Sequence, residues 1–131
     1  MVKAQSSRTV NADMNAMWQN FLRQKVNSFV KWDLVRFFHD NPHTADTADS
    51  IAHVVGRDTH AVLQELDDLV KVNVLVKENV SGQSIYRLTT DNAMRNVVHE
   101  FVVACHDRDF RIRAINHVIH GMGFSPQGAS N

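Results

Sequence analysis

The sequence predicts a mainly helical protein that carries one small β-hairpin. Apolar residues recur at helical spacing on both sides of Gly56, a residue suited to a tight turn between two helices. Two β-rich runs follow, Val74–Glu78 and Ser84–Leu88, and a Gly-containing loop at 79–83 separates them. Amphipathic helical stripes precede and follow this central part. We therefore expect a helix, a turn, a helix and a hairpin, with further helices at both ends.

Composition indicates one compact domain in the cytoplasm. The chain of 131 residues is long enough for one core. It has no apolar run long enough to span a membrane, and its first thirteen residues lack the apolar stretch of a signal peptide. A single cysteine, Cys105, excludes an internal disulfide and suits a reducing compartment.

The N-terminal part, residues 1–27, is expected to be a tail and a leader helix. Residues 1–10 are polar and unpatterned, so we expect them to be frayed. A helix is expected from Asn11, and either it runs on or Asn27–Ser28 caps a new one. The apolar stripe of this part comprises Met14, Trp18, Phe21, Leu22, Val26 and Phe29. Phe29–His39 should be the next helix, which ends before Pro42.

The central helices have clear signals at their ends and on their faces. After a connector at 43–47, Thr44 or Thr47 caps the first helix, and Asp58 caps the second. The buried stripe of the second helix is Val62, Leu66 and Leu69, and its outward stripe is His60, Gln64, Asp67, Asp68 and Lys71. Two short helices joined in this way form a helix-turn-helix, whose second helix can enter the DNA major groove.

Residues 28–90 resemble the winged helix-turn-helix of bacterial and archaeal transcription regulators of the MarR and ArsR type. The matching residues are Ile51-Ala52 with Gly56, Val62, Leu66 and Leu69, Val74-Leu75, and Tyr86-Arg87-Leu88-Thr89. The sequence departs from the pattern at Arg57, where an apolar residue is usual, and at Asn73, where Gly is common. These are framework residues, so the resemblance implies a fold more than a function.

Two helices are expected after the hairpin, over residues 91–121, before a flexible tail at 122–131. Thr90 or Asp91 caps the first helix, which runs to about His106, and Asp107 or Asp109 caps the second, which ends at Gly121. The last helix has two apolar faces: one holds Ile112, Ile115 and Ile119, and the other holds Phe110, Ala114 and Val118. Two bodies are needed to cover them, so we predict a homodimer through Trp18, Phe21, Ile112, Ile115 and Ile119.

The predicted DNA contacts lie on the second central helix and the hairpin. His60 and Gln64 face outward near the helix start, where Gln can bond adenine, and His60 or Thr59 can reach a base or a phosphate. Arg57 in the turn, and Lys77 with Gln83 on the hairpin, are candidate phosphate contacts, whereas Arg87 is equally suited to pairing with a carboxylate. A merely solvated helix face is the alternative, and Asp67 and Asp68 support it.

The charge balance does not favour nucleic acid. The chain has fourteen basic and fourteen acidic residues, and the segment 46–78 has three basic against seven acidic, a net charge of −4. By contrast the chain through Arg36 has a net charge of +4. The sequence therefore leaves two interpretations open, a DNA-binding regulator and a winged helix that binds protein through an acidic face.

Other residues suit a metal site, a redox sensor or an effector pocket less well. His106, His117 and His120 have the spacing of helix-borne zinc ligands in ArsR-type sensors, but the register relative to the hairpin differs, so we predict no metal site and rank a metal-responsive repressor third. Cys105 could sense oxidants, although an inert buried thiol fits its stripe better. Five aromatic residues are interpreted first as core, and the alternative is that they line a pocket for a small-molecule effector: Trp18, Phe21, Trp32, Phe37 and Phe38. No catalytic motif is present, so we expect neither an enzyme nor a cofactor.

Overall fold

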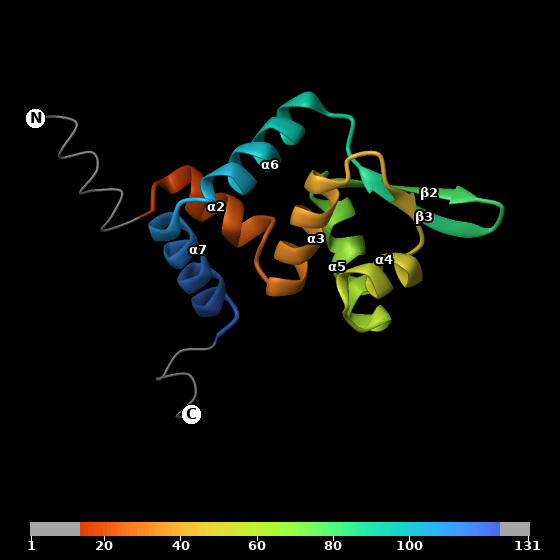
Figure 1. The fold of residues 1–131 in the computed structure, drawn as a ribbon, viewed down its shortest axis with the longest axis horizontal. Coiled ribbons are helices and arrows are strands. Elements are labelled where there is room, and N and C mark those ends of the chain that lie inside the picture. Colours follow the sequence, from red (N-terminus) through yellow and green to blue (C-terminus); the bar gives the residue numbers. More distant parts are fainter. Residues whose placement is uncertain (1–13, 124–131) are drawn as a thin grey trace, which may run out of the picture. The chain divides into compact units, whose positions relative to one another are not determined.

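The computed structural model describes residues 14–123, which fall into two compact units (Figure 1). Unit 2 is the continuous segment Phe29–Val102, and unit 1 combines the chain before Phe29 with the chain after Val102. The described chain is mainly helical and has a small three-stranded antiparallel sheet, so the coarse fold class is confirmed. Residues 1–13 and 124–131, with the expected fraying of 1–10 and most of the expected tail, lie outside the described part.

Unit 2 contains three helices and three strands before its last helix. Its elements in chain order are α3 (Phe29–Asp40), β1 (Ala45–Asp46), α4 (Ala48–Val55), α5 (Thr59–Lys71), β2 (Leu75–Val80), β3 (Gln83–Leu88) and α6 (Asn92–Ala104). The stripe predicted on α5 is confirmed, because Val62, Leu66 and Leu69 have no exposed surface. They share a core with residues of α3 and the sheet, among them Leu34, Phe38, Leu75 and Tyr86.

The helices α4 and α5 have the predicted N-caps. The Thr47 side chain accepts from the Ser50 amide at 3.2 Å, and Asp58 accepts from the Ala61 amide at 3.0 Å. Gly56 ends α4 with φ of 72°, the left-handed conformation that glycine adopts without a steric penalty. Thr47 and Asp58 therefore fix where the two helices begin.

The sheet differs from the prediction at two places. The strands reach further than expected, so only Ser81 and Gly82 form the loop, with φ of 53° and 82°. Two positive φ values in a two-residue loop make the turn that best suits twisted strands, and the Asn79 side chain accepts from the Gly82 amide at 3.1 Å. The connector at 43–47 was also expected to be irregular, yet β1 pairs with β3, giving the order β1-β3-β2.

Unit 1 contains α2 (Ala16–Gln24) and α7 (Arg108–Gly121), which pack against each other. The leader helix stops at Gln24 and a new helix begins at Phe29, which decides the alternative left open around residue 27. The Trp18 ring makes edge contacts with Phe21 and Phe110, each at 5.6 Å between ring centroids. Phe21, Leu22, Ala114 and Val118 are buried, so the second predicted face of α7 covers α2.

Candidate nucleic-acid interface

The outward face of α5 presents His60 and Gln64 to solvent, as predicted. The buried residues Val62, Leu66 and Leu69 lie on the opposite face of the helix, and the Asp58 cap fixes its first turn. Within residues 14–123 neither side chain has a hydrogen-bond partner, so both are available to a ligand. Leu63 lies between them in sequence and is also exposed, at 38%. The start of α5 therefore offers two polar groups and one apolar side chain.

Thr59 is less available than its neighbour His60. Its hydroxyl donates to Oδ1 of Asp49 at 3.0 Å, a bond that joins the first residue of α5 to α4. The residue is exposed, but its donor is already used. A contact from Thr59 to DNA would therefore require this bond to break.

The two predicted phosphate contacts are paired within the chain. Nε of Arg57 donates to Oδ2 of Asp33 at 2.7 Å, and Nζ of Lys77 lies 3.2 Å from Oδ1 of Asp67. On the hairpin Gln83 is exposed, and Nε of Arg87 donates to Oε1 of Glu78 at 2.9 Å. The carboxylate pairing foreseen for Arg87 is confirmed. The same pairing at Arg57 and Lys77 was not foreseen.

Asp67 is the centre of a small polar cluster at the sheet. Its Oδ1 accepts from the Tyr86 hydroxyl at 2.7 Å as well as from Lys77. Burial acts to raise the pKa of the Asp67 carboxyl, but the bonds from Tyr86 and Lys77 outweigh burial and hold that pKa below its ordinary value. Burial and the bond to Asp67 raise the pKa of Tyr86. The cluster therefore keeps Asp67 ionised and Tyr86 protonated.

The remaining acidic residues of α5, Glu65 and Asp68, face Lys31, one of the basic residues behind the net charge of +4 through Arg36. Lys31 lies on α3 and is buried, with Nζ 3.2 Å from Oε1 of Glu65 and 3.3 Å from Oδ2 of Asp68. Lys31 therefore pairs with carboxylates of α5 and is not part of a free basic surface. Its register gives the signal that was missed, since Lys31, Leu34, Val35 and Phe38 follow the i, i+3, i+4, i+7 pattern of a buried face.

Charge separates cleanly between the two units. Unit 2 has seven basic and eleven acidic residues, a net charge of −4, whereas unit 1 has seven basic and three acidic residues, a net charge of +4. The predicted DNA contacts all lie in the acidic unit. Phosphate affinity at this interface therefore depends on individual side chains, because the overall field of unit 2 opposes it.

The predicted dimerisation residues differ in their availability. Ile112 is exposed, at 40%, while Ile115 and Ile119 are half-buried. Phe21 is instead 5% exposed, because it lies in the core of unit 1 under Trp18 and leaves little surface for a second subunit. The isoleucine face of α7 is therefore the better part of the predicted interface.

Between residues 14 and 123, no three or more His, Cys, Asp or Glu residues are grouped as a metal site. Cys105 is half-buried just after α6, which ends at Ala104 and so is shorter than predicted, and its carbonyl accepts from Arg111. None of the described helices is long and apolar enough to cross a membrane.

Comparison with models of known families, with curated proteins and with solved structures finds no match to this chain.

Proposed function

We propose that the chain is a sequence-specific DNA-binding transcription regulator of the winged helix-turn-helix kind that acts as a homodimer. The observation that carries the proposal is the start of α5, where His60 and Gln64 are exposed and unbonded beyond a capped turn. The hairpin of β2 and β3 extends away from the helices of unit 2, as a wing does (Figure 1). Gln64 suits adenine, and Lys77 with Gln83 suits the adjacent backbone.

The internal ion pairs weaken phosphate binding without preventing it. Side chains of Arg57 and Asp33 are 36% and 42% exposed, and those of Lys77 and Asp67 are 40% and 39% exposed. Surface pairs of this kind contribute only about 0–1 kcal/mol, so exchanging a carboxylate for a phosphate costs little. The freed carboxylate then lies close to the DNA, and we expect binding to be weak and steeply dependent on salt.

An electrophoretic shift series against genomic fragments, at low and moderate salt, tests the proposal. On a selected fragment, Gln64→Ala should reduce the discrimination between bases at one base pair by about 1–3 kcal/mol. Lys77→Ala should weaken binding to all DNA sequences alike. Gln24→Ala on α2 and Lys71→Ala, at an exposed position at the far end of α5, are matched controls that should change neither property.

A protein-binding role is the second candidate, and a specific observation favours it. Val54 on α4 is 64% exposed and Leu63 on α5 is 38% exposed, within a unit whose net charge is −4. Apolar side chains in an acidic surface suit a basic, partly apolar partner protein. Failure of the unmodified chain to shift any duplex at low salt would reject DNA binding and favour this role.

A further inference from the structure

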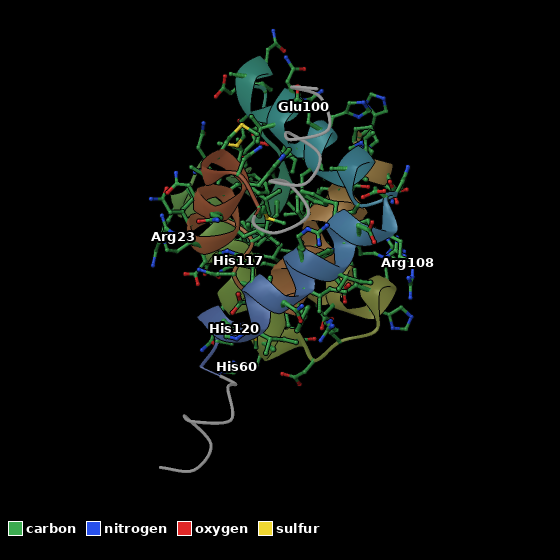
Figure 2. All side chains as sticks on the ribbon, turned by 90° about the vertical axis from the view of Figure 1, so that its left-hand side faces the viewer. Arg23, His60, Glu100, Arg108, His117 and His120 are labelled. Carbon is green, nitrogen blue, oxygen red and sulfur yellow. The ribbon has the colours of Figure 1, made fainter. Side chains whose placement is uncertain are left out.

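A pocket of about 440 Å³ opens in unit 1, between the end of α2 and the end of α7. Its apolar lining is Leu22, Val118 and Met122, and its polar lining is Arg23, Asn27, His117 and His120. Figure 2 shows Arg23 on α2 and the two histidines near the end of α7. The volume is within the range of small-molecule sites, about 300–1,000 Å³. The pocket is thus large enough for a small organic molecule.

The polar lining is positive and contains no carboxylate. Nη2 of Arg23 donates to the neutral amide oxygen of Asn20 at 2.9 Å, and within the described residues no acidic side chain pairs with it. This differs from Arg57, Lys77 and Arg87 in unit 2, each of which is paired with a carboxylate. Arg23 therefore keeps an uncompensated charge in the more basic of the two units.

Two histidines of α7 lie beside the same site. His117 and His120 are three residues apart on α7, so their side chains lie on neighbouring parts of one helix face. Nδ1 of His120 lies 2.7 Å from the Asn116 carbonyl oxygen, a contact that requires a proton on Nδ1. Nε2 of His120 has no partner in residues 14–123 and remains for a ligand.

We propose that this pocket binds a small organic carboxylate that has an apolar body. The planar guanidinium of Arg23 matches a carboxylate with two parallel hydrogen bonds. Leu22, Val118 and Met122 take the apolar body. The site lies wholly in unit 1, so the proposal is independent of DNA binding by unit 2.

Isothermal titration calorimetry of the full chain with hexanoate tests the proposal. We expect one saturable site, and affinity should rise from butanoate to octanoate by about twofold to fourfold per added methylene. Hexanamide has the same shape without the charge, and inorganic phosphate has charge without the apolar body. Both should bind at least about tenfold more weakly than hexanoate.

Two arginine variants separate the pocket from the general charge of unit 1. Arg23→Gln should weaken hexanoate binding about tenfold or more, whereas Arg108→Gln, the same charge change at the opposite end of α7, should leave it unchanged. Imidazole NMR signals of His117 and His120 should shift when hexanoate is added to the unmodified protein. Equal binding of hexanamide, equal loss in both variants, unmoved imidazole signals or no saturation at tens of millimolar hexanoate would each overturn the proposal.

Discussion

At the scale of single residues, the cluster of Tyr86, Asp67 and Lys77 is the most informative feature. One carboxylate oxygen of Asp67 accepts from both neighbours, and Lys77 lies opposite Tyr86 in the sheet, with Nζ 5.6 Å from the ring centre. The cluster ties α5 to the hairpin through side chains. It also occupies the lysine that was expected to be free for phosphate.

Tyr86→Phe removes the hydroxyl and keeps the buried ring. We expect the free energy of unfolding to fall by about 1–2 kcal/mol at neutral pH, because a hydrogen bond to a partly exposed carboxylate is lost. The folded pKa of Asp67 lies below its ordinary value of 3.8, so the stability it adds is complete above that value and is lost as pH falls through the folded pKa. The folded pKa of Tyr86 lies above 10.0, so its stability is complete below that value and is lost as pH rises through the folded pKa.

Urea unfolding of both proteins between pH 2 and pH 7, roughly the range in which carboxyl groups titrate, measures this difference. The gap between unmodified protein and Tyr86→Phe should narrow at the acid end, once Asp67 is protonated in the folded state. A gap that stays constant through the acid range would show that the hydroxyl does not act on Asp67.

At the scale of elements, Lys31 links α3 to α5 from a buried position. The lysine has two acidic partners on α5, and of these Glu65 is the less exposed, with a side chain 22% exposed. Removing one member of a buried pair leaves the other charge uncompensated, which is costlier than removing both. The Lys31–Glu65 pair therefore fixes how α3 and α5 align, and a single substitution at either residue should destabilise the fold.

Lys31→Met should lower the free energy of unfolding by about 2–4 kcal/mol, because Glu65 remains partly buried without its cation. The double variant Lys31→Met with Glu65→Met should recover most of this loss, since two apolar side chains of similar length then pack together. Urea denaturation of the unmodified protein, the two single variants and the double variant gives the coupling free energy between Lys31 and Glu65. Additive losses would contradict a direct interaction.

Elements whose signals are local could be predicted from the sequence, and elements that depend on distant partners could not. The Asp58 cap, the left-handed Gly56 and the stripe of Val62, Leu66 and Leu69 are read from a few adjacent residues. The two-residue strand β1 exists only because β3 lies beside it. The exposure of His60 and Gln64 could also be predicted, but Arg57 and Lys77 have partners 24 and 10 residues away, beyond the reach of a local pattern.

At the scale of the whole molecule, the outer face of α7 carries the assembly prediction. Ile112→Glu with Ile119→Glu should convert a dimer into monomers, because burying an apolar side chain of this size contributes about 1.5–3 kcal/mol. If the chain binds DNA as proposed, a dimer would also place the two α5 helices about 34–36 Å apart on a palindromic site. Light scattering at tens of micromolar measures the molecular mass. Asn92→Glu with Asn96→Glu adds the same charge at exposed positions of α6 and should leave the dimer intact.

A monomeric mass for the unmodified protein at that concentration would reject the dimer. It would also count against recognition of a palindromic DNA site, because a single acidic unit has few phosphate contacts to keep it bound to DNA.

The two units also differ in when the growing chain can complete them. Unit 2 is continuous, so all of its strands and helices are available once residue 102 has left the ribosome. Unit 1 needs α7 to cover Phe21 and Leu22 of α2, and α7 is the last described helix to be synthesised. Since domains form as units during synthesis, α2 leaves the ribosome early and waits with its apolar face uncovered. Nascent chains in which unit 2, but not α7, has left the ribosome would accordingly hold a folded unit 2 and an α2 open to chaperones.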